Sequence, residues 1–238
     1  MALTTVLFDL DGTLLPMDQE EFVRAYFHKM AGKLAPLGYE PEKLVGAIWK
    51  GTNAMIANDG RCTNETVFWE TFCQVFGPDA MKDKAIVDSF YLQEFQQVRA
   101  VCPCNPQAAQ TIHRLQELGL TLALATNPIF PAPGTHSRIR WAGLEVEDFA
   151  LCTTYENCRF SKPNPNYYRD ILQQLGVSAQ ECLMVGNDVG DDMVAREVGM
   201  SVFLLTDCLI NPQNVDIDQF PHGSVPQLMD HIRTLLAL

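Results

Sequence analysis

The sequence predicts an α/β protein with a Rossmann-like, doubly wound parallel sheet that carries an inserted all-helical domain. From Val101 onward, short apolar runs alternate with helical patterns, which is typical of parallel strands joined by crossover helices. Between the first apolar run and Val101 the strand runs disappear, and apolar residues recur only at helical spacing. We therefore expect a core made of residues 1–16 and 99–238 and a helical insertion over residues 17–98.

The first strand is expected at Val6-Leu7-Phe8, and it leads directly into Asp9-Leu10-Asp11-Gly12-Thr13. This order places two carboxylates at the carboxyl end of a buried strand, where open α/β sheets bind their ligands. We expect the chain to coil after Asp9, so that Asp9 and Asp11 face one pocket. Gly12 makes such coiling easy. Two neighbouring carboxylates repel each other, and a hard divalent cation relieves that repulsion.

The insertion is expected to contain four helices and no strand. Apolar residues recur in it at three- to four-residue spacing, and glycine or proline follows each of the first three patterns. The expected helices are Asp18 to Leu34, capped by Asp18 and Glu21 and stopped at Pro36 and Gly38; Leu44 to Met55, before Asn58-Asp59-Gly60; Thr63 or Asn64 to Gly77; and Asp79 to Phe95.

The rest of the chain is expected to alternate helix and strand. The expected elements are a helix from Asn105-Pro106 to Gly119, a strand over 121–126, a shorter strand over 149–154, a helix from Asn164-Pro165 to Gly176, a strand over 182–186, a helix ending near Gly199, a strand over 202–205 and a helix capped by Ser224. The proline-dense segment 127–134 is expected to be a loop close to the site that serves mainly as a connection.

The charge of the chain restricts its partners. The formal net charge is −12, from 17 basic and 29 acidic residues, which argues against nucleic acid and anionic membranes as partners. An anionic substrate must then meet a local positive site. No leader-like or membrane-spanning pattern is visible, so we expect a cytoplasmic monomer or homodimer. The eight cysteines include no Cys-x-x-Cys pair, which argues against a zinc or redox dithiol site.

The motif Asp9-Leu10-Asp11-Gly12-Thr13 resembles the first motif of the haloacid dehalogenase superfamily. The later motifs of that family follow in order: Thr126 at a strand end, Lys162 in Ser161-Lys162-Pro163-Asn164-Pro165, and the acidic cluster Gly186 to Asp192. The resemblance covers residues 1–16 and 99–210. It implies the phosphatase branch of the superfamily, and the helical insertion resembles the C1-type cap of that branch.

The resemblance also implies a role for each of these residues. Asp9 would attack phosphorus and form an aspartyl-phosphate, and Asp11 would be the general acid and base. Thr126 would donate to a phosphate oxygen, and Lys162 would supply the positive charge that both phosphate and nucleophile need. We expect Asn127 and Thr13 to be substrate-binding residues.

The acidic cluster Gly186 to Asp192 is the expected second half of a Mg²⁺ site that Asp9 begins. The full set of expected metal-site residues is Asp9, Asp11, Asp188, Asn187, Asp192 and Asp191, with the side chain of Asp11 kept free for proton transfer. The family pattern has Gly-Asp and a second Asp four residues later, but Asn187 occupies the first acidic position here. We favour Asp188 as a direct ligand, and the choice between Asp191 and Asp192 stays open. The rival interpretation is that these acids only stabilise a helix N-terminus.

The predicted function is that of a Mg²⁺-dependent phosphomonoester hydrolase acting on a small phosphorylated metabolite. A phosphomutase acting on a sugar phosphate and a non-catalytic, partner-binding domain are the alternatives. Intact Asp9, Asp11, Thr126 and Lys162 argue against the second. Residues of the insertion that could contact substrate are Trp49, Lys50, Asn53 and Arg61, although core packing is the expected role of Trp49.

Overall fold

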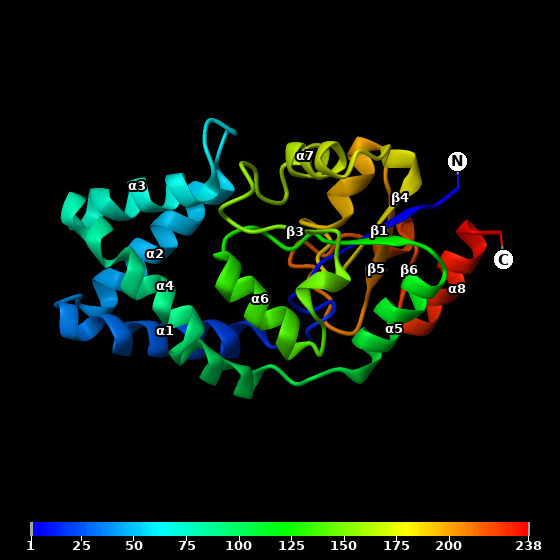
Figure 1. The fold of residues 1–238 in the computed structure, drawn as a ribbon. Coiled ribbons are helices and arrows are strands. Elements are labelled where there is room, and N and C mark those ends of the chain that lie inside the picture. Colours follow the sequence, from blue (N-terminus) through cyan, green and yellow to red (C-terminus); the bar gives the residue numbers. More distant parts are fainter. Residues whose placement is uncertain (1, 238) are drawn as a thin grey trace.

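The computed structural model describes residues 2–237, so that Met1 and Leu238, the two ends of the predicted core, lie outside the described residues. A six-stranded parallel sheet forms the centre of the fold, with strand order β3-β2-β1-β4-β5-β6 (Figure 1). The strands are β1 Thr5–Phe8, β2 Thr121–Leu124, β3 Leu151–Cys152, β4 Cys182–Gly186, β5 Ser201–Leu205 and β6 His222–Gly223. The short edge strand β6 was not predicted.

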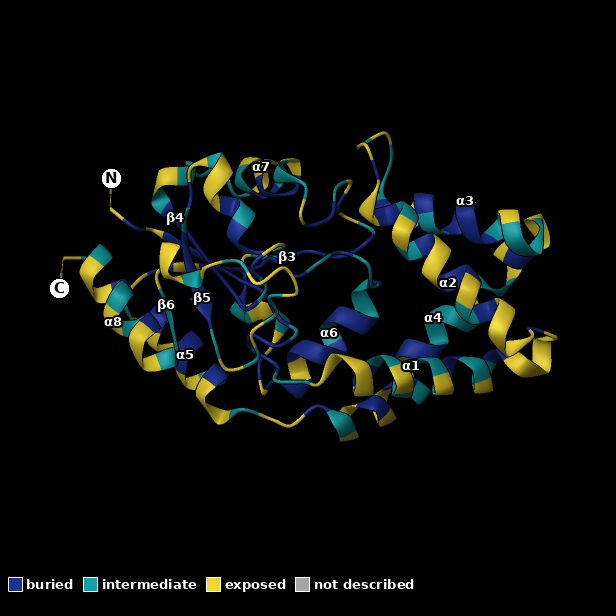
Figure 2. Cartoon of the chain, turned by 180° about the vertical axis from the view of Figure 1, so that it is seen from behind, coloured by how far each residue is buried: buried dark blue, intermediate teal, exposed yellow. Residues whose placement is uncertain are grey.

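Helices cover both faces of the sheet because successive strand residues point to opposite sides. Val6 and Phe8 belong to the apolar cluster shared with α5 (Pro106–Glu117) and α8 (Val225–Leu235). Leu7 belongs to the second cluster, shared with α7 (Pro165–Leu175). The strands β1 and β4 are buried throughout, whereas the edge strands β3 and β6 are half-buried and the outer faces of α5 and α8 are exposed (Figure 2). The predicted doubly wound α/β fold is therefore confirmed.

The order of the strands places the functional residues. From β1 the chain adds β2 and β3 on one side, and then returns to add β4, β5 and β6 on the other. The direction of winding therefore changes next to β1. In open α/β sheets, ligands bind outside the carboxyl ends of the strands at such a point. Here the segments that follow β1, β2 and β4 meet at this place.

Residues 19–101 form a helical region without strands, which lies to one side of the sheet (Figure 1). Its α-helices are α1 Gln19–Leu34, α2 Pro41–Ile56, α3 Asn64–Phe76 and α4 Lys84–Leu92. Asp18 caps α1 by accepting from the backbone N–H of Glu21 at 2.9 Å, and Thr63 caps α3. Among the described residues, no helix is both long and apolar enough to cross a membrane.

The predicted continuous helix from Asp79 to Phe95 is wrong. The chain forms a 3₁₀ segment (Pro78–Asp83), then α4, and then, after Gln93, a second 3₁₀ segment (Glu94–Val101). Phe90 and Phe95 are both fully buried, with ring centroids 5.9 Å apart. Residues five apart lie on different faces of an α-helix, so a continuous helix could not bury both rings in one core. The break at Gln93, whose φ of −119° and ψ of −87° are not helical, brings them together.

Helix α6 (Ala132–Trp141) begins inside the segment 127–134 that was predicted to be a loop. The segment is dense in proline, but proline is well tolerated in the first helical turn, where Pro133 lies. The segment predicted as a helix ending near Gly199 is instead a 3₁₀ helix, Met193–Val198. In Figure 1, α6 lies between the helical region and the sheet, so it also helps to place the residues of the site.

Candidate active site

Asp9 and Asp11 line one cleft of about 300 Å³ at the centre of the carboxyl edge of the sheet. The backbone N–H of Asp9 donates to the carbonyl of Val185 at 2.9 Å, which ties this residue to β4. The chain then turns, with Gly12 in the left-handed region at a φ of +85°. A Cβ on Gly12 would lie 2.3 Å from Nδ2 of Asn187, so both the conformation and the close approach require glycine.

Thr13 and Asn187 support the carboxylate of Asp9 from behind. Thr13 Oγ1 lies 3.1 Å from Asp9 Oδ2 and 2.9 Å from Asn187 Oδ1, and its hydroxyl proton is shared between these two acceptors. Asn187 Nδ2 donates to the carbonyl of Cys208 at 2.7 Å. Thr13, predicted to bind substrate, is buried and does not line the cleft. Asn187 lines the cleft, but its amide oxygen already accepts from Thr13.

Lys162 forms ion pairs with both Asp9 and Asp192. Its Nζ lies 2.9 Å from Asp9 Oδ1 and 2.6 Å from Asp192 Oδ1, and its side chain is only 2% exposed. Burial by itself disfavours the ammonium, but Asp192 and Asp9 reverse that effect and raise the pKa of Lys162 well above its ordinary value. The amine is therefore a fixed positive charge beside Asp9.

The structure separates Asp191 from Asp192, which the sequence left as alternatives. Asp192 is buried, pairs with Lys162, and accepts from the backbone N–H of Asp188 at 2.9 Å. A Cβ on Gly186 would lie 2.0 Å from Asp192 Oδ2, so glycine leaves room for this carboxylate. Asp191 instead accepts from Asn127 Nδ2 at 3.1 Å, and burial together with Asp188 raises its pKa to about 6.

Thr126 and Asn127 follow β2 and line the cleft opposite the acidic cluster. The hydroxyl of Tyr167 donates to the carbonyl of Thr126 at 2.8 Å, which holds the end of the strand in place. Asn127 Oδ1 is buried and accepts no hydrogen bond from any described residue. Burying such an oxygen is costly unless a bound group donates to it.

Arg138 on α6 is the residue that sequence reasoning missed. Its side chain is buried, and its guanidinium contacts Asp11 Oδ2 and lies 4.2 Å from the ring centroid of Phe130. Burial raises the pKa of Asp11, and the charge of Arg138 opposes that rise. The sequence did hold a signal for this residue, because Arg138 lies among apolar residues such as Ile139 and Trp141, and a buried arginine needs a partner. The signal could be used only if α6 was predicted to be a helix.

The donor set fits a hard cation such as Mg²⁺. Five aspartates line the cleft, whereas Lys162 and Arg138 are the two cations in contact with them in residues 2–237. No three His, Cys, Asp or Glu side chains in that range are arranged to hold an ion by themselves. Mg²⁺ keeps several waters and usually takes only one or two carboxylates, so it does not need such a group. Asp11 Oδ1, buried and without a hydrogen-bond partner in the described chain, points to the same need for a cation or donor. The five aspartates are Asp9, Asp11, Asp188, Asp191 and Asp192.

The wall of the cleft opposite the sheet comes from residues 17–56. Of the four residues expected to reach substrate, only Trp49 lines the cleft; Lys50 and Asn53 do not, and Arg61 pairs with Glu70 at 2.8 Å. The predicted core-packing role of Trp49 is wrong, because 45% of its surface is exposed. The residues that form this wall are Met17, Gln19, Phe22, Val23, Trp49, Thr52 and Ile56.

A doubly wound sheet with acids, a lysine and a threonine gathered at its carboxyl edge defines a class of hydrolase. Residues 3–199 match the family model of the haloacid dehalogenase-like hydrolases. The chain therefore belongs to this family, and the resemblance inferred from its motifs is confirmed.

Named relatives support the same assignment. The chain is 27% identical over 205 residues to a phosphoglycolate phosphatase of Vibrio parahaemolyticus, covering 84% of this chain and 82% of the relative. It is 23% identical over 237 residues to an N-acetylmuramic acid 6-phosphate phosphatase of Pseudomonas aeruginosa, covering 99% and 94%. A 2-haloacid dehalogenase of Pseudomonas syringae shares the fold, with a TM-score of 0.62 at 24% identity and coverage of 99% and 98%.

Proposed function

We propose that this hydrolase is a Mg²⁺-dependent phosphatase that hydrolyses the phosphomonoester of a small metabolite through an aspartyl-phosphate. The observation that carries the proposal is the contact of Lys162 with Asp9, 2.9 Å between Nζ and Oδ1, at the wall of a cleft that Asp11 also lines. Relatives named as phosphatases support phosphate esters as the substrate class.

Each side chain has a role in this reaction. Asp9 attacks phosphorus, so that one difficult displacement becomes two easier ones. Lys162 offsets the negative charge that phosphate and nucleophile bring together, and Thr126 donates a hydroxyl to a phosphate oxygen. Asp11 protonates the leaving oxygen and later removes a proton from the attacking water. The raised pKa of Asp11 suits this role, because burial helps its carboxyl to hold a proton.

We assign Asp9 and Asp188 as the carboxylates that would hold Mg²⁺. One oxygen of Asp188 accepts from the backbone N–H groups of Gly190 and Asp191 at 2.7 and 3.0 Å, which fixes the carboxylate at the wall of the cleft. Mg²⁺ in this place supplies positive charge to the phosphoryl group. Asp192 positions Lys162, and Asn187 positions Thr13, so neither is needed as a direct ligand.

We also propose the division of the chain into a catalytic core, residues 1–16 and 99–238, and a helical cap, residues 17–98. The support for this division is that seven residues between Met17 and Ile56 line the cleft from the side opposite the sheet. A cap in that place would exclude water from the reacting phosphate and contact the leaving group.

The test is the release of inorganic phosphate from a panel of phosphomonoesters, measured with Mg²⁺ and with a chelator. We expect release that depends on Mg²⁺ and that is absent in Asp9→Asn, while the melting curve of the variant shows an intact fold. Equal activity in Asp9→Asn would refute the mechanism. Silence across the whole panel would favour a phosphomutase or a non-catalytic domain.

A further inference from the structure

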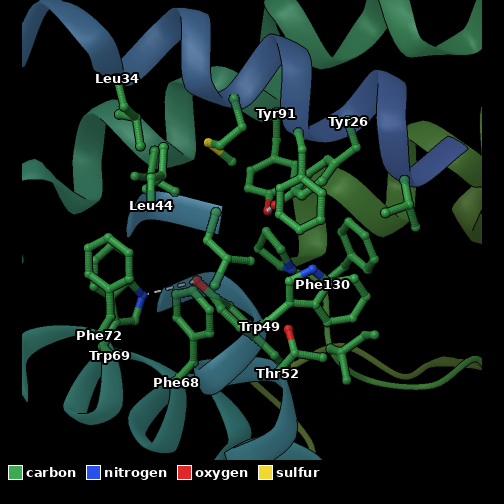
Figure 3. A pocket seen from close by; sticks show the side chains of 18 of the residues that line it. Tyr26, Leu34, Leu44, Trp49, Thr52, Phe68, Trp69, Phe72, Tyr91 and Phe130 are labelled. Atoms are coloured by element: carbon green, nitrogen blue, oxygen red, sulfur yellow. Dashed lines mark hydrogen bonds between the residues drawn. The ribbon is translucent and has the colours of Figure 1, made fainter. Parts of the chain in front are cut away.

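The helical region encloses an apolar cavity of about 110 Å³ between α1, α2, α3 and α4. Its walls are mainly aromatic. Figure 3 shows the side chains of Tyr26, Phe68, Trp69, Tyr91 and Phe130 arranged around a common space. Protein cores rarely leave space larger than a water molecule, so a cavity of this size among large side chains calls for an occupant.

The cavity adjoins the active-site cleft, because six residues line both spaces. The side chains that line both spaces come from α1, α2 and the loop after β2, and they include Trp49, Thr52 and Phe130. Arg138, which contacts Asp11, packs against Phe130, with its guanidinium 4.2 Å from the ring centroid. The cavity therefore lies next to the cleft, where the leaving group of a phosphate ester bound at Asp9 can reach it.

None of the residues that line the cavity is charged, and the wall of the cleft between Met17 and Ile56 has no charged residue either. Four of the polar side chains in the cavity wall bond to one another in pairs. The hydroxyls of Tyr26 and Tyr91 are 2.9 Å apart, and Trp69 Nε1 donates to the hydroxyl of Tyr155 at 3.5 Å. A carboxylate would meet no cation here, and the many hydroxyls of a sugar would meet few polar partners beyond Thr52 and Trp49, so burying either group is costly.

We infer that this cavity binds the apolar part of the leaving alcohol, and that the substrate is the phosphate monoester of an uncharged alkyl or aryl alcohol. The inference rests on the proposed phosphatase function. The cavity is somewhat smaller than engineered cavities of about 150 Å³ that bind benzene, which suits a chain of roughly four to six carbons. In the reaction the P–O bond to the alcohol breaks, Asp11 gives its proton to the alcohol oxygen, and water supplies the oxygen of the released phosphate.

The first experiment measures kcat/KM for a series of linear alkyl phosphates from ethyl to octyl, with Mg²⁺. Each added methylene is expected to raise kcat/KM about fourfold until the cavity is full, after which the values level off. Phosphoglycolate, whose leaving group carries a carboxylate, is expected to be at least tenfold poorer than butyl phosphate. Values that stay flat or fall with chain length, or a preference for phosphoglycolate, would overturn the inference.

A matched pair of variants tests the location. Val87 lines the cavity, whereas Val75 does not; both are half-buried valines in helices of the same region. Val87→Phe is expected to move the plateau to shorter chains, and Val75→Phe is expected to leave it in place. An unchanged plateau in a folded Val87→Phe, or equal shifts in the two variants, would show that the alkyl chain of the substrate binds outside this cavity.

Binding supplies a readout that does not need turnover. The affinity of hexylphosphonate and of methylphosphonate for the protein, measured by titration calorimetry, is expected to favour the hexyl compound by more than tenfold, and Val87→Phe is expected to remove most of that preference. Phosphate release without dependence on chain length would refute this inference and leave the proposed function standing. If no ester is hydrolysed, the proposed function fails, and equal affinity for the two phosphonates would then refute the cavity as an apolar site as well.

Discussion

Replacing Lys162 by methionine removes the positive charge from the centre of the site while keeping an unbranched side chain. In the native protein Nζ lies 2.9 Å from Asp9 and 2.6 Å from Asp192, and the side chains of Lys162 and Asp192 are 2% and 1% exposed. Removing one partner from a buried ion pair leaves an uncompensated charge, which typically costs about 3–5 kcal/mol. We expect Lys162→Met to lose about that much of its free energy of unfolding, together with its phosphatase activity.

The loss should depend on pH. Burial raises the pKa of Asp192 to about 7 even with Lys162 opposing the rise, so the pKa must rise further in Lys162→Met. A group whose pKa is higher in the folded than in the unfolded protein contributes stability at low pH and loses that contribution as the pH rises through the folded value. The difference between wild type and Lys162→Met is therefore expected to be smaller at about pH 5 than at about pH 8.

Urea unfolding followed by tryptophan fluorescence measures this difference, with a chelator present at both pH values. Lys84→Met is the matched control. Lys84 bridges Glu65 at 3.2 Å and Asp88 at 2.8 Å, but its side chain is 28% exposed, so its removal is expected to cost about 1 kcal/mol or less. Equal losses in the two variants, or a loss in Lys162→Met that grows as the pH falls, would refute the reasoning.

Other changes test the remaining contacts. Arg138→Gln removes the charge that lowers the pKa of Asp11, so the fall in kcat/KM at alkaline pH should move to higher pH. An unchanged alkaline limb of the pH profile would show that Arg138 does not influence proton transfer by Asp11. Asp188→Ala should raise the Mg²⁺ concentration needed for half-maximal activity more than Asn187→Ala does, and the reverse order would mean that the ligands are assigned in the wrong register. Gly12→Ala should cost about 1–3 kcal/mol in thermal or urea unfolding, because its φ of +85° and the 2.3 Å approach of Asn187 exclude a Cβ, and an unchanged stability would contradict that geometry.

The features that the sequence predicted correctly are those with a local cause. The central strands are short apolar runs, and Asp18 and Thr63 cap their helices through backbone groups three residues away. Gly12 permits the coil after Asp9 because of its own backbone freedom. The order of the motifs then placed the acids and Thr126 at the ends of strands that a parallel sheet brings together, with Lys162 just before a helix.

The errors in the helical predictions have a common source. Periodicity shows that a segment is apolar on one face, but it does not show where the chain must bend to reach the core. The break at Gln93 exists because Phe90 and Phe95 bury against the same neighbours, and α6 exists because proline in a first turn is compatible with a helix.

Within the site, only the tertiary structure could distinguish neighbouring residues of the same type. Asp191 and Asp192 are chemically identical, yet a one-residue shift turns one toward Asn127 and the other toward Lys162. The contact of Arg138 with Asp11 joins residues 127 positions apart, and no local pattern encodes it.

Short stretches of sequence therefore determine the class of the fold and the chemical groups of the site, because strands, turns and motif residues depend on near neighbours. The partners of each charged group and the apolar cavity beside the cleft depend on how distant helices pack. Packing is decided by the shapes of many side chains at once, so these features became visible only in the folded molecule.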